Sequence, residues 1–409
     1  MENYTVAKDL TSVGEKREGA KTSACCIVNE HKIYDFVLIG AGMAGASAAY
    51  FLAREGSVLV LEMESQPGYH TTGRSAALFV EGYGNAQIRS LTSGGRGFLV
   101  SPPDGFCDTP ILSPRGALCV GREDQMASLD AAYQSGSELV DSMQRLNAAE
   151  VHELVPVFRD GYVAGGVLET EAMDIDVNAL HQGFLSGAKA GGAELQSNAR
   201  VQGLSRENGG WTIDLGSEKI FAKVVINAAG AWCDEVADLA GASRVGLVPK
   251  RRTAVLFEGP DDIPFAHWPA FIDADEEFYA RPESGALMGS PADETPMEPC
   301  DVQPEELDIA IAIDRLQTAT TLQIKRVIRK WAGLRSFVAD KTPVVGFDPH
   351  VEDFFWLAGQ GGYGIQTAPS MGRVSAALAA GGDVPDDLAK FGVDAMALSP
   401  ARFDPASAG

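Results

Sequence analysis

A strand–helix–strand pattern stands near the start of the chain. Residues 33–39, IYDFVLI, are a β-branched apolar run that predicts a buried strand. Residues 40–56, GAGMAGASAAYFLAREG, begin with small residues and continue with apolar residues at helical spacing, which predicts a helix. Residues 57–62, SVLVLE, predict a second strand that ends in an acid.

Helical and strand patterns then alternate along the rest of the chain. Helices are predicted over residues 122–146, over 174–195, which starts with an Asp cap, and over 304–320. Short strands and turns are predicted over residues 199–230, where ENGG at 207–210 indicates a hairpin, and over 245–300. Residues 354–382 predict a strand, a Gly-rich turn and the last helix.

The order of these patterns predicts an α/β nucleotide-binding domain interrupted by an antiparallel α+β domain. A chain of 409 residues is also too long for one core. The predicted parts are a polar N-terminal extension at 1–32, a nucleotide-binding domain at 33–80, 172–243 and 340–409, and a substrate domain at 81–171 and 244–339.

Composition excludes several classes of partner. The net charge of −23 argues against nucleic acid and anionic membrane surfaces, because both require basic surface. No apolar stretch has the length of a signal peptide or a membrane span. The six cysteines lack C-x-x-C spacing and the six histidines lack H-x-x-x-H spacing, so we expect free thiols, a cytoplasmic protein and no metal site.

Three glycines after the first strand form G-x-G-x-x-G, a dinucleotide-binding fingerprint. Gly40 permits the tight turn, Gly42 admits a pyrophosphate and Gly45 allows the helix to pack closely. Glu62, at the end of the second strand, can accept hydrogen bonds from a ribose. NAD and FAD both use this unit. Further strand ends rich in small residues, at 224–232 and 359–372, favour a longer cofactor wrapped by distant segments.

Seven segments, in order, resemble the D-amino-acid oxidase-like FAD-dependent oxidoreductases, and within them most resemble the D-arginine dehydrogenases. The segments are GAGMAGAS, GYHTTGRSAA, DIDVNALHQGF, VINAAGAWCD, PKRRTA, WAGLRSFVADKTPVVG and GQGGYGIQTAPSMG. The resemblance implies a discontinuous FAD-binding Rossmann-type domain with an inserted antiparallel α+β substrate domain. It also implies hydride transfer from the α-carbon of an amine to flavin N5, followed by hydrolysis of the imine to a 2-oxo acid and ammonia.

Three side chains are expected to bind a substrate carboxylate. Arg335 matches the family's carboxylate arginine, and its fork suits bidentate binding. Arg252 matches the second arginine, and strand alternation turns Arg251 the other way. Tyr279 can donate from its phenol, while Phe278 faces the core. The alternatives are a surface salt bridge for Arg335, solvated side chains at both 251 and 252, and a tyrosine that only packs.

The resemblance assigns the remaining site residues. The cofactor-binding residues would be Gly40, Gly42, Ala44, Gly45, Glu62, Met63, Thr71, Thr72, Arg74, Ser75, Ala76, Ala77, Leu78, Val201, Ala229, Gly230, Gly364, Ile365, Gln366 and Thr367. The substrate-binding residues would be Tyr83, Arg252, Tyr279, Arg335, Gln366, Leu78 and Ala117. Of these, Arg335, Tyr279, Arg252 and Tyr83 would act in catalysis. No side chain is identified as a general base.

The segments after the fingerprint divide into two parts. Residues 71–77 would lie along the cofactor, with Arg74 against either cofactor or protein. Residues 80–86 form a candidate lid, in which flanking glycines let Tyr83 close over the ligand. The alternative is a tyrosine packed in a rigid turn. The amides of residues 364–367, at the start of the last helix, would stabilise negative charge on the flavin.

Two positions depart from the D-arginine dehydrogenases. Leu78 replaces a histidine, and Ala117 replaces the glutamate that pairs with the substrate guanidinium. An unpaired buried guanidinium costs several kcal/mol. We therefore expect a preference for neutral or apolar D-amino acids, unless Glu81 or Glu276 reaches the substrate.

Two other functions stay open at this point. One is an FAD-dependent oxidase of secondary amines or 2-hydroxy acids that produces hydrogen peroxide. The other is a flavin-containing binding or sensor module without turnover. The electron acceptor would be a quinone, another carrier or O2, and the protein a monomer or homodimer.

Overall fold

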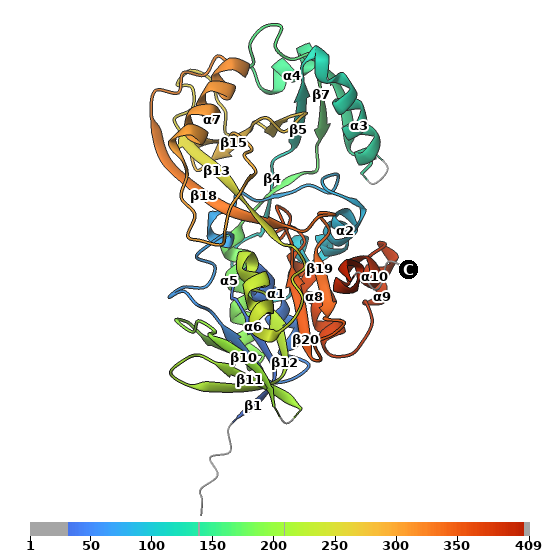
Figure 1. The fold of residues 1–409 in the computed structure, drawn as a ribbon. Helices are drawn as coiled ribbons and strands as arrows, with labels where there is room; N and C mark the ends of the chain where they lie inside the picture. Colours follow the sequence, from blue (N-terminus) through green and yellow to red (C-terminus); the bar gives the residue numbers. More distant parts are fainter. Residues whose placement is uncertain (1–31, 138–139, 208, 405–409) are drawn as a thin grey trace, which may run out of the picture. The chain divides into compact units, whose positions relative to one another are not determined.

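The first strand–helix–strand unit forms as predicted, with β1 (Ile33–Ile39), α1 (Met43–Leu52) and β2 (Val58–Leu61). The computed structural model describes residues 32–137, 140–207 and 209–404 (Figure 1). All but the last residue of the predicted N-terminal extension lies outside these ranges.

An eight-stranded sheet is built around this unit. Its order is β10-β11-β12-β1-β2-β9, with β20 beside β12 and β19 beside β20. Strands β12, β1, β2, β9 and β20 run parallel, as a Rossmann-type sheet requires. The further strands are β9 (Glu194–Gln196), β10 (Gly203–Glu207), β11 (Gly210–Asp214), β12 (Lys219–Asn227), β19 (Val344–Phe347) and β20 (Phe354–Ala358). The pairing of Glu207 with Gly210 confirms the hairpin predicted at residues 207–210.

A nine-stranded sheet is formed by the segments assigned to the substrate domain. Its order is β17-β13-β16-β15-β14-β5-β7-β6, with β18 along β13, and every pair is antiparallel except β5 with β14. The strands are β5 (Ala117–Gly121), β6 (Met143–Asn147), β7 (Gly165–Glu169), β13 (Val248–Phe257), β14 (Ala270–Asp273), β15 (Tyr279–Glu283), β16 (Ala286–Ser290), β17 (Thr295–Pro296) and β18 (Val327–Phe337).

A three-stranded sheet, β3-β8-β4, completes the strand pairing in the described chain. It consists of β3 (Leu78–Phe79), β4 (Leu112–Pro114) and β8 (Met173–Ile175). The fold is therefore the α/β class that the sequence predicts. The boundaries between the two predicted domains stay a prediction.

The helices agree with the sequence patterns in part. They are α2 (Ala86–Val100), α3 (Met126–Ser137), α4 (Ala148–Leu154), α5 (Val177–Ala190), α6 (Cys233–Ala240), α7 (Glu306–Ala319), α8 (Ala368–Ala379), α9 (Asp386–Lys390) and α10 (Ala395–Leu398). Single 3-10 turns are η1 (Thr72–Arg74), η2 (Glu123–Gln125), η3 (Gly230–Trp232) and η4 (Pro400–Phe403). The Asp cap predicted at the start of the segment 174–195 is two residues further on, at Asp176, which accepts from the Ala179 amide at 2.8 Å, while Asp174 lies in β8.

Three predicted helices are wrong in extent. The helix expected over 174–195 covers only Val177–Ala190, because the residues at its two ends pair in β8 and β9. The helix expected over 122–146 ends at Ser137, because the segment that follows forms β6 and bonds along its length to β7. Pairing with a neighbouring strand overrides the local helical spacing there. The helix expected to be last, α8, begins at Ala368 rather than Gly364 and is followed by α9 and α10.

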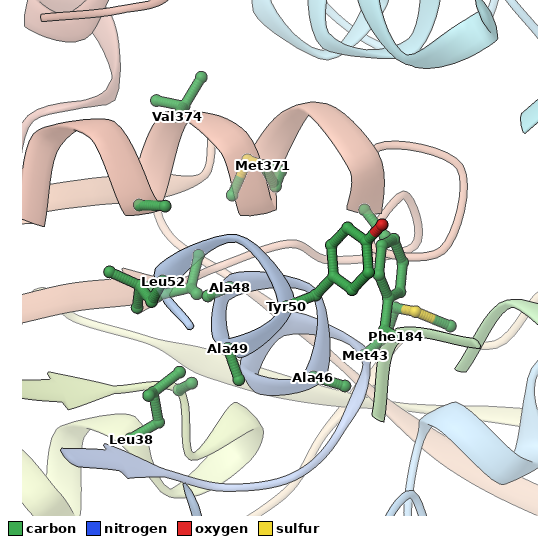
Figure 2. Close-up of a cluster of buried hydrophobic side chains, with 14 of the residues drawn as sticks. Leu38, Met43, Ala46, Ala48, Ala49, Tyr50, Leu52, Phe184, Met371 and Val374 are labelled. Atoms are coloured by element: carbon green, nitrogen blue, oxygen red, sulfur yellow. The ribbon is translucent and has the colours of Figure 1, made fainter. Parts of the chain in front are cut away.

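Helix α1 lies at the centre of the largest buried cluster (Figure 2). It packs against α8 on one side and α5 on another, with the Tyr50 and Phe184 rings 5.6 Å apart. Helix α2 also contributes, since Leu91 and Leu99 lie in this cluster. Residues assigned to the substrate domain by sequence therefore pack in the core of the nucleotide-binding part.

Close packing of α1 depends on Gly45. A Cβ atom at this position would overlap the carbonyl oxygen of Gly40 and would also touch the Ala228 side chain. Gly40 itself has φ +106°, which favours glycine. The turn between β1 and α1 is thus as tight as the fingerprint requires.

Replacing Gly45 with Ala should lower the free energy of unfolding by about 1–3 kcal/mol, because α1 must move away from the turn. The matched control is Gly97→Ala in α2, where nothing lies within 4 Å of the added methyl group. That variant should gain roughly 0.5–1 kcal/mol from helix propensity. Urea unfolding of the FAD-free proteins measures both. Equal stability of the two variants would contradict the packing role.

Candidate active site

One cavity of about 480 Å³ brings together most of the predicted site residues. It is lined by segments that are far apart in sequence, from the β1–α1 turn to the loop after β20. The predicted residues that line it are Gly40, Gly42, Ala44, Glu62, Met63, Thr71, Thr72, Arg74, Ser75, Ala76, Ala77, Val201, Ala229, Gly230, Arg252, Tyr279, Arg335, Gly364 and Ile365.

The fingerprint turn is held by side chains from three directions. The Glu62 carboxylate accepts from the Ala41 amide at 2.8 Å, and Thr72 Oγ1 accepts from the Met43 amide at 3.0 Å. His181 Nε2 lies 2.9 Å from the Ala41 carbonyl oxygen, and burial lowers the pKa of His181, so the neutral ring donates there. Sequence reasoning missed His181, because its position in a helix gives no sign of this contact.

The cavity beside the fingerprint is shaped for a pyrophosphate. A Cβ atom at Gly42 would meet only Thr72 Oγ1, at 3.4 Å, which is an ordinary contact. The protein itself therefore does not require glycine there, and the open space is left for a ligand. The Ala44 amide in the first turn of α1 has no hydrogen-bond partner in residues 32–137, 140–207 and 209–404, as expected for a group that binds phosphate.

Residues 71–77 are fastened to β18. Thr71 Oγ1 donates to the Leu334 carbonyl oxygen at 2.8 Å, and Trp331 Nε1 donates to that of Arg74 at 2.9 Å. The Arg74 guanidinium donates to the Ala332 carbonyl oxygen at 3.2 Å and pairs with Asp301. The charge of Arg74 is thus compensated by protein, although its side chain lines the cavity.

The two predicted arginines lie on adjacent strands and face the same cavity. Strands β13 and β18 run side by side along their length (Figure 1), with Arg252 opposite Gly333 and Lys250 opposite Arg335. Arg252 Nε donates to the Asp293 carbonyl oxygen at 2.9 Å, and its Nη2 lies 3.1 Å from Glu294.

The neighbouring arginine, Arg251, takes no part in the cavity. Its side chain pairs with Glu305 and, at 2.8 Å, with Asp308. The predicted alternation of residues 251 and 252 is therefore confirmed.

Arg335 differs from Arg252 in having no counter-ion. No carboxylate of the described chain lies within ion-pair distance of its guanidinium, which packs over the backbone of Gly362. Burial lowers the pKa of Arg335, but the nearby phenols and Glu276 outweigh burial and raise it overall, so the side chain is a cation. A free cation in a cavity is an anion site.

Tyr279 lines the same end of the cavity. Burial raises the pKa of its phenol, but the positive charges of Arg335 and Arg252 outweigh that effect and lower it overall. The Arg252 guanidinium lies 5.9 Å from the centre of the Tyr279 ring. Phe278 is buried in the core on the opposite face, as predicted.

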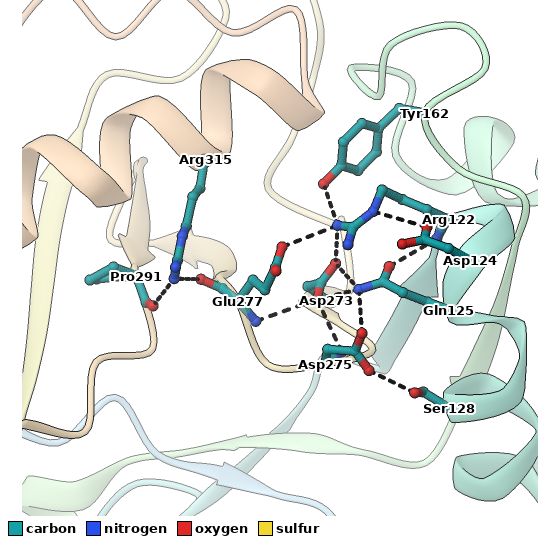
Figure 3. Close-up of polar contacts among 10 residues, drawn as sticks. All are labelled: Arg122, Asp124, Gln125, Ser128, Tyr162, Asp273, Asp275, Glu277, Pro291 and Arg315. Atoms are coloured by element: carbon teal, nitrogen blue, oxygen red, sulfur yellow. Dashed lines mark hydrogen bonds and ion pairs between the residues drawn. The ribbon is translucent and has the colours of Figure 1, made fainter.

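A polar network fixes the turn that precedes Tyr279 (Figure 3). Asp273, 1% exposed, accepts from Gln125 Nε2 at 2.9 Å and lies 3.3 Å from Arg122 Nη1. The turn places Glu276 in a left-handed conformation with φ +57°. Sequence reasoning missed this network, whose members come from distant segments.

Tyr83 lies beside Arg335 but does not line the cavity. Its hydroxyl donates to Glu276 Oε1 at 3.3 Å, and its ring lies 5.1 Å from that of Tyr363. Burial raises the pKa of Tyr83 while Arg335 lowers it, and burial dominates. Tyr363, in the motif GQGGYG, was not assigned a role from the sequence, although an aromatic residue among glycines could have drawn attention to it.

Several other predicted residues also lie outside the cavity lining. Gly45 packs inside the turn. Leu78 of β3 lies opposite Asp174 of β8, and Ala117 of β5 lies opposite Glu169 of β7. Leu78 and Ala117 are the positions that depart from the D-arginine dehydrogenases.

The prediction for residues 364–367 needs correction. They form turns before α8, so Gly364 and Ile365 reach the cavity through the loop rather than from a helix terminus. The Gln366 side chain is 4% exposed and bonds to both backbone groups of Val80 and to Thr92. Thr367 Oγ1 donates to the Tyr363 carbonyl oxygen at 2.9 Å. Both side chains are therefore taken up by protein contacts.

The described residues hold no group of three or more His, Cys, Asp or Glu arranged to bind a metal. Among the same residues, no helix is both long enough and apolar enough to span a membrane. Cys107, Cys119, Cys233 and Cys300 are free thiols, while Cys25 and Cys26 lie outside the described residues.

Comparison with known proteins agrees with this architecture. The family model for FAD dependent oxidoreductases, DAO, matches residues 35–378. An uncharacterized oxidoreductase, YurR, of Bacillus subtilis is 24% identical over 87% of this chain and 97% of its own length. The sarcosine oxidase subunit beta of Rhizobium meliloti is 25% identical over 88% of each chain.

Among solved structures, glycine oxidase from Geobacillus kaustophilus has the same fold. It superposes with a TM-score of 0.76 at 20% identity, over 88% of this chain and 97% of that one. The family match covers most of the chain, and the cavity has a glycine turn, a buried acid at the end of β2 and an amide of α1 without a partner in the described residues. This chain belongs to the DAO family of FAD-dependent oxidoreductases, and its cofactor is FAD.

Proposed function

We propose that this protein is an FAD-dependent dehydrogenase that deaminates D-amino acids to 2-oxo acids and ammonia. The observation that carries the proposal is Arg335, a cation without a counter-ion that faces the FAD cavity beside Arg252. An α-carboxylate supplies the missing charge. The D configuration rests on the sequence motifs shared with the D-arginine dehydrogenases.

The side chains around the carboxylate would orient the substrate. Arg335 has a free planar fork and binds the carboxylate through two parallel hydrogen bonds. Arg252, whose charge Glu294 compensates, contributes a hydrogen bond, and the Tyr279 hydroxyl donates to the same group. Three contacts to one carboxylate fix the direction of the α-carbon.

FAD, held by the fingerprint turn and residues 71–77, would supply the acceptor for a hydride from the α-carbon. The substrate is left as an imine, which water hydrolyses to the 2-oxo acid and ammonia. Tyr83, whose ring packs on Tyr363 beside Arg335, limits access of water to the carboxylate. We assign no general base, because a substrate amine that binds in its neutral form needs no proton removed before hydride transfer.

The preference for neutral or apolar side chains rests on four positions. Leu78 and Ala117 offer no charge to a substrate guanidinium. Glu81 pairs with Arg96, and Glu276 accepts from Tyr83 and lies in the field of Arg335. Both acids that could have replaced the missing glutamate are therefore engaged by the protein.

The second candidate is an oxidase of secondary amines or 2-hydroxy acids that produces hydrogen peroxide. It is favoured by the names of similar proteins, a sarcosine oxidase subunit and a glycine oxidase. These substrates also carry a carboxylate, so the anion site suits them equally. Peroxide formed per turnover separates an oxidase from a dehydrogenase that passes electrons to a quinone or another carrier.

An anaerobic screen tests the proposed function. The holoenzyme is mixed with D- and L-amino acids, N-methyl amino acids and 2-hydroxy acids, and loss of flavin absorbance near its visible maximum is recorded. D-amino acids should bleach the flavin and L-amino acids should not. If only N-methyl amino acids bleach the flavin, the result would favour the oxidase of secondary amines instead. A flavin that no compound reduces would instead indicate a binding or sensor module.

Replacing Arg335 with Lys should raise KM for the best D-amino acid by on the order of 10- to 100-fold, because a point charge replaces two charged hydrogen bonds. Arg329→Lys is the matched control, since Arg329 lies on the same strand but is exposed. FAD content should stay unchanged in both. An Arg335→Lys enzyme with wild-type KM would remove the basis for the carboxylate site.

D-arginine should be a poorer substrate than D-leucine, D-methionine or D-phenylalanine. The expected difference in kcat/KM is at least about tenfold, the effect of leaving one charged group without a partner. Steady-state kinetics with an artificial electron acceptor measures it. A higher kcat/KM for D-arginine would show that Glu276 or another acid reaches the substrate.

A further inference from the structure

The segment of residues 80–84 carries Tyr83 and is bound to a buried carboxylate. Glu169, at the end of β7, is 4% exposed. Its Oε1 accepts from the Glu81 amide at 2.8 Å, and its Oε2 lies 3.2 Å from the Gly82 amide. One carboxylate thus binds two successive amides immediately before Tyr83.

The local sequence fits this contact. A Cβ atom at residue 82 would lie 2.9 Å from Glu169 Oε2, so a side chain there would displace the carboxylate. Gly82 does not have a positive φ, whereas Gly84 has φ +98°. Gly82 therefore provides room for the carboxylate, and only Gly84 has the conformation of a glycine turn.

Other contacts bind the segment on the remaining sides. The Gln366 side chain bonds to the amide and the carbonyl of Val80, and the Glu81 carboxylate pairs with Arg96 of α2. Residues 80–82 are thereby connected to the turns before α8, through Gln366, to α2 and to the nine-stranded sheet. These contacts fix the backbone of residues 80–82. The hinged lid predicted for residues 80–86 is therefore not favoured.

We propose that Glu169 is a positioning residue for substrate binding. Through the amides of residues 81 and 82 it holds the segment so that Tyr83 stays beside Arg335 at the edge of the carboxylate site. The role of Tyr83 in this inference rests on the proposed function. The contact of Glu169 with the two amides is observed in the structure and does not depend on that function. Glu169 is suited to this because β7 is paired on both sides, with Ala117 of β5 and Met143 of β6 opposite it.

The contact should depend on pH. Burial raises the pKa of Glu169, and the charge of Glu81 adds to that effect, while the two amides and Arg96 oppose it. Glu171 pairs with the same arginine at 2.7 Å. The ionised carboxylate accepts from both amides. As the pH falls through this raised pKa, one oxygen gains a proton and a bond is lost, at a pH above the titration of an ordinary glutamate.

Glu169→Gln in the holoenzyme tests the proposal. The amide side chain can accept from one backbone amide but presents a second donor to the other. Hydrogen exchange at residues 81–83 should accelerate about tenfold or more, because one charged hydrogen bond is lost. KM should rise with kcat little changed. In the wild-type enzyme KM should increase as the pH falls through the raised pKa of Glu169, and this increase should be absent in the variant. FAD content and Tm should stay near the wild-type values.

Glu171→Gln is the matched control. Glu171 contacts the same Arg96, but its side chain is 52% exposed and it bonds to no amide of the segment. This variant should keep wild-type exchange, KM and pH dependence. Equal effects of the two substitutions would overturn the proposal, because they would reflect only the charge around Arg96.

A third measurement keeps the test independent of the variant's folding and of turnover. In the wild-type holoenzyme, exchange at residues 81–83, corrected for its intrinsic pH dependence, should accelerate as the pH falls. Exchange without such a change would overturn the proposal. Faster exchange in Glu169→Gln with an unchanged KM would also overturn it, by separating the contact from substrate binding. Failure of every amino acid to reduce the flavin would contradict the proposed function instead, and exchange would still decide the contact.

Discussion

The pairing of β13 with β18 is the constraint on which the candidate site depends. The register places Lys250 opposite Arg335 and Arg252 two residues further along, so three cations share one face of a sheet. Like charges directly opposite each other destabilise a sheet. Glu294 lies 2.8 Å from Lys250 Nζ and 3.1 Å from Arg252 Nη2, so one carboxylate compensates two of the three charges. The third charge, on Arg335, is left for the ligand.

An uncompensated cation is stable at this position because aromatic and polar groups surround it without neutralising it. Burial lowers the pKa of Arg335, but electrostatic interactions with Tyr279, Tyr83, Glu276 and Tyr363 outweigh it and raise the pKa. The same field lowers the pKa of Tyr279 and leaves that of Tyr83 raised by burial. Two phenols near the same two arginines therefore differ in acidity, because Tyr279 also has hydrogen bonds to Ser290 and Arg252 that lower its pKa, whereas Glu276 raises the pKa of Tyr83.

The sequence was sufficient for the class of fold and for the fingerprint turn, because these depend on local spacing. The family resemblance indicated the two arginines that line the cavity, and their role stays a prediction. The sequence was insufficient for contacts that join distant segments. Gln366 was expected at the ligand but bonds to Val80, and the strand β6 was read as helix, since each is decided by a partner far away in the chain. The sequence does not predict the contacts of His181, Glu169 and Asp273 either, because their partners also lie far away in the chain. A buried polar side chain has no periodicity that reveals its partner.

The short segment at residues 71–74 connects two binding elements. Thr72 holds the first amide of α1, while Thr71 and Arg74 bond to the backbone of β18 near Arg335. A ligand that orders the fingerprint turn should therefore also favour order in the strand that carries the anion site, and any such coupling would act equally in both directions. The cofactor and the carboxylate ligand would thus both stabilise the segment of residues 71–74. Saturation with either ligand should therefore increase the affinity for the other.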